Sequence, residues 1–213
     1  MLNAFVYIIE SPSDFDLLDS RTEGKTLCGA LDLASIKHSY SLVSSKKAFV
    51  EAINNRLLRY WQEHNVSPIL HFSMHGNDQG IELTNGDFIQ WYQLSQLLAP
   101  LNDAMQGGLL ICMSSCFGAS GCRMAMHEED HFPFWALIGN EVSANWTDAA
   151  VAYVTFYHQF FKETSIEDCV KKMCIASGDS NFKVYLGHSI NKNWKDLMNK
   201  NRQENIIAAL RKS

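Results

Sequence analysis

The stretch ILHFSMHG, residues 69–76, is an apolar run that ends in His75 and Gly76. A second apolar run, LLICMSSC at 109–116, ends in Cys116, which follows His75 by 41 positions. Short apolar runs bounded by polar residues or glycine are typical of buried strands. We therefore expect two buried strands, one tipped by a histidine and the other by a cysteine.

Around these two runs, strand patterns alternate with helix patterns. Further strands are expected at 4–9, 39–43, 81–83, 134–138 and 182–186, and helices at about 22–34, 45–60, 91–101, 145–161, 165–178 and 194–210. Pro100 is expected to end or kink the third helix, and 117–132, which has no clear period, is expected to be a mobile loop. Such alternation predicts a single α/β domain over 1–213, with a mostly parallel sheet of about six strands.

The composition excludes several classes of protein. The 213 residues are 46% hydrophobic and 19% charged, as in an ordinary globular chain. With a net charge of −5, no nucleic-acid partner is expected. No run is long enough to span a membrane, and the first residues fit a strand better than a signal peptide. Six cysteines without the spacing of a disulfide scaffold favour a reducing, cytoplasmic location.

The two strand tips suggest a nucleophile and its base. Parallel strands place their carboxyl ends, and hence a catalytic site, at one edge of the sheet. A thiolate at Cys116 would attack a carbonyl, and the imidazole of His75 would take up and return the proton. The backbone N–H groups of Gly76 and Cys116 would form a two-donor oxyanion hole.

Two other interpretations use the same residues. The chain holds five more cysteines and seven more histidines, and most buried residues of both types are structural. Alternatively, His71, His75, Cys112 and Cys116 would ligate zinc. Residues four apart on a strand lie about 13 Å apart, which is poor geometry for a tetrahedral site. We therefore expect no metal, and we expect His71 and Cys112 to be core residues.

At these motifs the chain resembles the caspase-like (clan CD) cysteine peptidases, and among them most closely the bacterial CHAT-type proteases. The segments that carry the resemblance are ILHFSMHG, LLICMSSC, ESPSDFDLLDSRTEGKTL at 10–27 and ANWTDAAVAYVTFY at 144–157. In the order of its elements the resemblance covers nearly the whole chain. It implies a caspase-like three-layer sandwich.

The resemblance also implies a function. His75 matches the catalytic histidine, Gly76 the oxyanion glycine and Cys116 the nucleophile, with no third acid. It implies an endopeptidase that cleaves a protein or peptide through a thioester acyl-enzyme, without a cofactor. By analogy with related bacterial proteases, the substrate would be a gasdermin-like or other effector in an antiviral defence or cell-death system. Whether an activating partner is needed stays open.

Substrate specificity is where the chain departs from the caspases, which hold a substrate aspartate with an arginine before the first helix and a glutamine two residues before the cysteine. Arg21 stands at a similar place, but position 114 is a serine. An acid at Glu141 or Asp148 would instead favour a basic substrate residue. Both follow the strand expected beside the cysteine strand, although Asp148 also suits a helix start.

Two alternatives to a peptidase stay open. A caspase-like domain without catalysis would bind a partner in the cleft, and a thiol hydrolase would use the same dyad on a small molecule. Turnover of a peptide library discriminates a peptidase from a binding module, and only substrate screening separates the thiol hydrolase.

Overall fold

The computed structural model describes residues 2–129 and 132–210. Its strands are β1 (Ala4–Ser11), β2 (His38–Leu42), β3 (Ser67–Asn77), β4 (Gly80–Glu82), β5 (Phe88–Gln90), β6 (Leu110–Ser114), β7 (Ala136–Asn140) and β8 (Phe182–Leu186). Its helices are α1 (Asp14–Leu18), α2 (Glu23–Leu33), α3 (Lys46–Glu51), the π-helix η1 (Ala52–Leu57), α4 (Leu58–His64), α5 (Trp91–Ala104), the 3-10 helix η2 (Gly118–Ala125), α6 (Trp146–Phe160), α7 (Ile166–Ser177) and α8 (Gly187–Leu210).

The central sheet has the order β2-β1-β3-β6-β7-β8. In this order, the neighbouring strands β2, β1, β3, β6 and β7 run parallel, and the edge strand β8 is antiparallel to β7. A short hairpin of β4 and β5 continues antiparallel from the end of β3. The expected mostly parallel sheet of about six strands is confirmed, with the hairpin as an addition.

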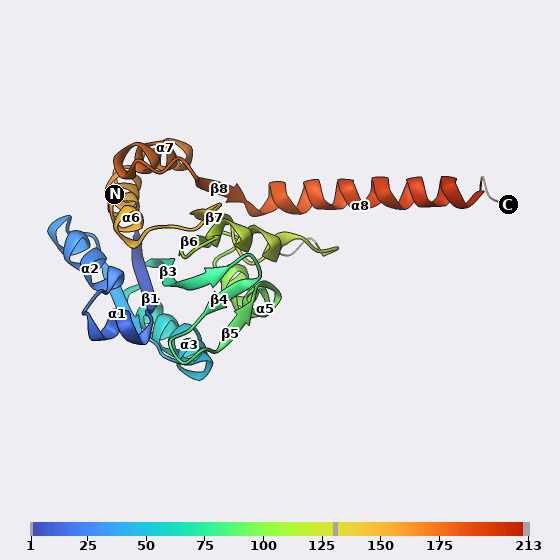
Figure 1. The fold of residues 1–213 in the computed structure, drawn as a ribbon. Helices are drawn as coiled ribbons and strands as arrows, with labels where there is room; N and C mark the ends of the chain where they lie inside the picture. Colours follow the sequence, from blue (N-terminus) through green and yellow to red (C-terminus); the bar gives the residue numbers. More distant parts are fainter. Residues whose placement is uncertain (1, 130–131, 211–213) are drawn as a thin grey trace.

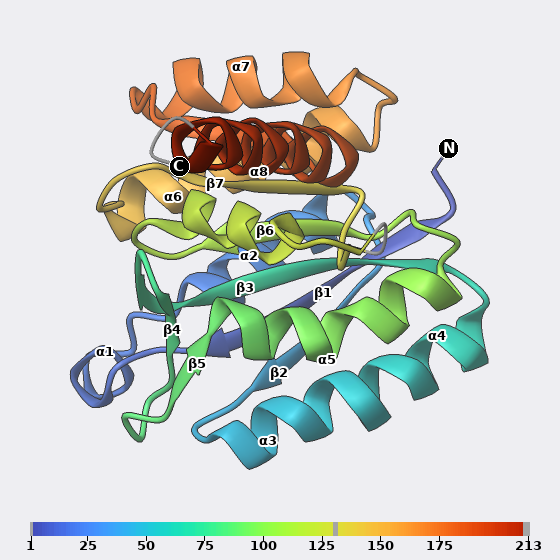
Figure 2. The same ribbon diagram turned by 90° about the vertical axis from the view of Figure 1, so that its right-hand side faces the viewer.

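Helices cover both faces of the sheet, which confirms the three layers (Figures 1 and 2). On one face, α3, η1, α4 and α5 pack over side chains such as Phe5, Tyr7 and Phe72. On the other face, α2, α6 and α7 pack over Val6 and Ile8, which alternate with the first set along β1. The whole of β1 is buried, as two-sided coverage of a parallel strand requires.

Most expected elements form where the pattern placed them, because their caps are local. Ser45 accepts a hydrogen bond from the N–H of Ala48 at the start of α3, and Asn145 accepts one from Thr147 at the start of α6. Ser165 does the same for α7, and Gly178 ends that helix with a positive φ of 74°. The final helix, α8, begins at Gly187, earlier than expected, and projects away from the sheet (Figure 1).

The prediction that Pro100 ends or kinks its helix is wrong in one respect, since α5 continues through it to Ala104. Pro100 lies on the exposed side of the helix, where the carbonyl that loses its donor can bind water. Leu94, Leu98 and Leu101 bury the opposite side. Packing of that apolar face outweighs the one hydrogen bond that proline removes.

The segment after Cys116 is also not the loop that we expected over its whole length. Residues 118–125 form η2, in which Gly118, Gly121 and Met124 are buried at a period of three. A 3.6-residue pattern does not detect such a helix. Gly118 packs so closely on Gly139 of β7 that a Cβ on Gly139 would lie 2.5 Å from the carbonyl carbon of Gly118. Residues 130–131 lie outside the described residues.

No helix in the described part of the chain combines the length and the apolar character that crossing a membrane requires.

Candidate functional site

The strand register aligns His75 with Cys116. β3 and β6 are parallel neighbours, and their last paired residues are Ser73 and Ser114. Side chains two positions apart point to the same face of a strand. The same offset of 41 residues, continued by two positions, brings His75 level with Cys116 at the carboxyl edge of the sheet. The register thus pairs the two strand tips that the sequence singled out.

A tight turn presents Cys116 at this edge. Phe117 has a left-handed backbone, with φ of 54° and ψ of 26°, which is rare for a bulky residue. Its N–H donates to the carbonyl of Val142, and the N–H of Gly118 donates to the carbonyl of Ser115. Within the described residues, no backbone carbonyl accepts from the N–H of Cys116 itself. That N–H is therefore available to a substrate oxygen.

His75 and Cys116 share a small pocket of about 80 Å³. The residues that line it are Met74, His75, Ser114, Ser115, Cys116, Ala144, Trp146 and Ala149. The ring of Trp146 stands edge-on to that of His75, with 5.6 Å between centroids, and thereby limits the rotation of the imidazole. The Cys116 sulfur lies 3.2 Å from the hydroxyl oxygen of Ser143.

Gly76 occupies a position where a side chain would be crowded. A Cβ there would lie 3.0 Å from the carbonyl oxygen of Gly80 and 3.3 Å from the Cβ of Ser115, the residue before Cys116. Glycine lets the end of β3 approach the turn that carries the cysteine. This close approach fits a role for the Gly76 N–H beside the nucleophile.

The structure adds an acid that the sequence analysis did not single out. Oδ2 of Asp16 lies 3.4 Å from Nε2 of His75, the separation of an ion pair, while no described residue forms a hydrogen bond with Nε2. A hydrogen bond from the Ser13 hydroxyl, together with the neighbouring His75, holds the pKa of Asp16 below its usual value. Ser13 caps α1 by accepting from the N–H of Asp16, and the Ser-x-x-Asp pattern is the signal that would have marked this helix.

For a catalytic His75, replacement of Asp16 by asparagine is expected to lower kcat by about tenfold with little change in KM, because the carboxylate would stabilise an imidazolium there without touching the substrate. Steady-state kinetics on a peptide substrate measure this split. Asp16→Glu keeps the charge and should recover part of the loss, whereas Asp14→Asn, on the exposed side of the same helix, is the matched control. An Asp16→Asn enzyme with unaltered kcat would show that the carboxylate plays no part.

A second acid, Glu23 at the start of α2, lies beneath the pocket. Its side chain is 2% exposed. It accepts hydrogen bonds from Ser73 at 2.6 Å and from Ser114, whose hydroxyl lies 2.8 Å from both carboxylate oxygens. Burial raises the pKa of Glu23 to about 7, and the two serines only partly oppose this. The sequence showed Glu23 only as part of a helix pattern, since its burial depends on three separate elements.

The residues proposed for specificity lie in different places. Ser114 lines the pocket. Arg21 is 66% exposed and pairs with Asp19 and Asp16, so it braces the loop that carries Asp16. Glu141 accepts a hydrogen bond from Tyr185 at 2.7 Å. Asp148 is half-buried in the first turn of α6. The residues that line the pocket do not include Arg21, Glu141 or Asp148.

His71 and Cys112 are core residues, as expected. Both are fully buried, and Nδ1 of His71 lies 3.0 Å from the hydroxyl of Tyr157. Burial lowers the pKa of His71 to about 3, so the ring is neutral. Among the described residues, no group of three or more histidines, cysteines or acids is arranged to hold a metal ion.

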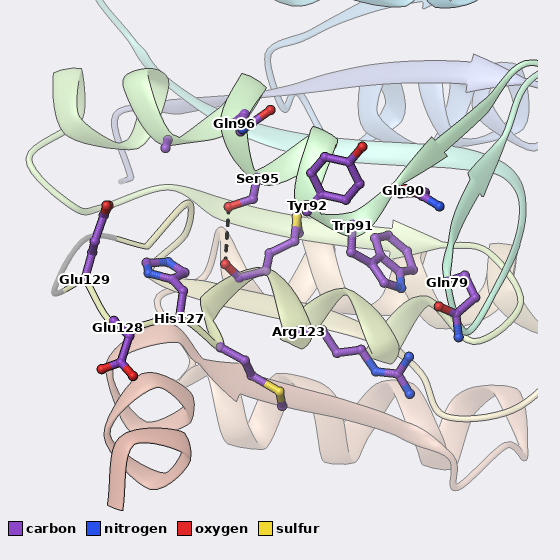
Figure 3. A pocket seen from close by; sticks show the side chains of 13 residues that line it. Gln79, Gln90, Trp91, Tyr92, Ser95, Gln96, Arg123, His127, Glu128 and Glu129 are labelled. Carbon is purple, nitrogen blue, oxygen red and sulfur yellow. Dashed lines mark hydrogen bonds between the residues drawn. The ribbon is translucent and has the colours of Figure 1, made fainter. Parts of the chain in front are cut away.

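A cavity of about 630 Å³ (Figure 3) shares no lining residue with this pocket. Trp91 and Tyr92 of α5 form one side, and Arg123 of η2 lies opposite, where it donates to the carbonyl of Asp78. No cysteine is among the described residues that line it. Because volume alone supplies no chemistry, we place the candidate active site at the smaller pocket, which a thiol and an imidazole both line.

Comparisons with known proteins give a distant structural likeness. No protein-family model and no curated protein matches the chain. Among solved structures, the Arg-specific cysteine proteinase gingipain R (RgpB) is 9% identical, with a TM-score of 0.48 over 83% of this chain. A complex of the pro- and mature domains of Porphyromonas gingivalis RgpB gives 9% identity and a TM-score of 0.49 over 89%. The chain spans less than half of either, 44% and 45%.

Proposed function

We propose that this chain is a cysteine endopeptidase in which Cys116 is the nucleophile and His75 the general base. The observation that carries the proposal is the shared pocket at the carboxyl edge of the sheet, where the strand register brings the two residues level. Asp16 is its positioning residue, because it holds a carboxylate 3.4 Å from His75. Gly76 and Cys116 supply the two backbone donors of the oxyanion hole.

The reaction follows from these roles. His75 takes the proton of the Cys116 thiol, and the thiolate sulfur attacks the carbonyl carbon of the scissile peptide bond. The carbonyl electrons move to oxygen, where the two N–H groups stabilise the negative charge. When the C–N bond breaks, His75 gives its proton to the leaving amine and a thioester remains. Water, deprotonated by His75, then releases the carboxylic acid and restores the thiol.

The alternatives draw less support from the geometry. Pockets for small molecules are typically about 300–1,000 Å³, whereas the pocket beside Cys116 is about 80 Å³, the scale of one side chain. This favours a polypeptide, whose remaining residues lie outside the pocket, over a small molecule. A CHAT-type identity, a cytoplasmic location and a role in defence through an effector substrate or an activating partner rest on the sequence resemblance, and identification of the natural substrate would test them.

Reaction with a thiol-directed peptide electrophile at pH 7 is expected to modify Cys116 at least about ten times faster than any other cysteine. Burial raises the pKa of the thiols at Cys28, Cys112, Cys122, Cys169 and Cys174, which leaves them poor nucleophiles. Mass spectrometry of the digested protein locates the label, and hydrolysis of a peptide library should fall in proportion to labelling. Labelling that spares Cys116, or hydrolysis that survives its full modification, would contradict the proposal.

A further inference from the structure

In the part of the chain that the structure describes, the carboxylate of Glu23 lacks a positive partner. Nε2 of His71 lies 4.0 Å from it, on a ring that burial keeps neutral. No lysine or arginine among the described residues pairs with it, and nearby Glu10 raises its pKa further. Glu10 has its own donors, the N–H of Gly24 and the hydroxyl of Tyr40. A buried carboxylate without a cation is costly to a fold and calls for a reason.

One side chain separates this carboxylate from the substrate pocket. Ser114 lines the pocket and also donates its hydroxyl to Glu23. Next to it in the chain, Ser115 lines the pocket as well and is 4% exposed, and its hydroxyl oxygen has no hydrogen-bond partner among the described residues. The pocket lining thus includes a serine hydroxyl bonded to a buried carboxylate without a cation among the described residues, and a second hydroxyl that is unused. Both would be satisfied by a hydrogen-bond donor that carries positive charge.

We propose that Glu23 sets the substrate specificity, so that the chain cleaves after an arginine or a lysine. This residue is called P1 because Cys116 attacks its carbonyl. Its cationic end enters the pocket that Ser114 and Ser115 line, and the Glu23 carboxylate lies behind Ser114. The inference rests on the proposed function, since it names the substrate class of that same site. Glu23 acts on the substrate through Ser114, to which it is hydrogen-bonded, and is therefore a positioning residue.

The same geometry disfavours an acidic P1 residue. An aspartate in the pocket would place a second negative charge near Glu23 in a site shielded from water, where like charges repel strongly. Arg21, the residue that would have held an aspartate, is engaged by Asp16 and Asp19 outside the pocket. The arrangement of charges therefore selects against the substrate residue that caspases require.

The test uses four fluorogenic peptides that differ only at P1, as arginine, lysine, glutamine or aspartate. The natural chain is expected to show kcat/KM at least about tenfold higher for arginine or lysine than for glutamine, and lowest for aspartate. In Glu23→Gln the ratio of arginine to glutamine should fall at least about tenfold. Glu23→Asp keeps the charge and should keep the direction of the preference. A role of Glu23 in folding alone would lower all four rates together and leave the ratio unchanged.

Controls separate this inference from the proposed function. Glu167→Gln, an exposed position on α7, is the matched change and should leave the ratio as it was. Cleavage that is indifferent to the charge of P1, or a ratio that moves in Asp148→Asn or Glu141→Gln instead, would overturn the role of Glu23 only. The proposed function would be overturned as well if the protein hydrolysed none of the four peptides and no member of a peptide library while its Cys116 still reacted with electrophiles.

Discussion

Replacement of Cys116 by alanine is expected to lower peptide hydrolysis by at least about a thousandfold, the scale on which loss of a catalytic nucleophile acts. Without sulfur, neither the thioester nor the proton transfer to His75 takes place. The side chain is half-buried at the end of a turn, so its loss should change the free energy of unfolding little. Fluorogenic peptide assays and urea unfolding of the same preparation separate the two effects.

Three further variants make this test specific. Cys122→Ala removes a thiol six positions away, in η2, and should hydrolyse peptides at the natural rate. His75→Ala should lose about as much activity as Cys116→Ala, and the double variant should lose no more than either, because nucleophile and base act as a unit. Additive losses, or activity that persists in Cys116→Ala, would show that the dyad is not the catalytic unit.

Replacement of Glu23 by glutamine is expected to stabilise the protein at pH 8 and to have little effect at pH 5. The pKa of Glu23 is raised from the usual 4.5 to about 7 by folding, so the folded state holds this proton more tightly than the unfolded state. Stability contributed by the neutral acid is full below pH 4.5 and falls as the pH rises toward 7. The shift corresponds to at most about 3 kcal/mol, which Glu23→Gln avoids because an amide stays neutral.

Urea unfolding at pH 5, 6, 7 and 8 measures this difference between the two chains. The stability gained by Glu23→Gln should grow with pH and level off above the folded-state pKa. The groups that surround Glu23 are Ser73 of β3, Ser114 of β6, Glu10 of β1 and the neutral His71, and all are retained in the variant. Parallel stability curves for the two chains would show that folding leaves the pKa of Glu23 unshifted.

A more stable but less selective Glu23→Gln enzyme would combine this result with the proposed specificity. It would mean that the fold tolerates an unfavourable buried charge because the site uses it. A loss of stability at every pH would instead mean that the carboxylate serves mainly to join β3 to β6 through the two serines.

The positions of most strands and helices were predicted well, because they depend on local features. Caps such as Ser45, Asn145 and Ser165 act within one turn of their own helix, and a buried strand shows its apolar run directly. The position of Pro100 in α5 was not predictable in this way, because the packing of a whole helical face decided it. The 3-10 helix after Cys116 escaped for a different reason, since its period of three resembles no pattern that was sought.

The sequence by itself determined the alternation of strands and helices and the two strand tips, His75-Gly76 and Cys116, because these follow from local periodicity and from the order of the chain. It could not show that the register of β3 on β6 levels His75 with Cys116, or that Asp16 lies beside His75. Nor could it reveal a charge at Glu23 beneath the pocket. Such contacts join residues from different elements, and only the packing of helices onto the sheet decides their distance, burial and pKa.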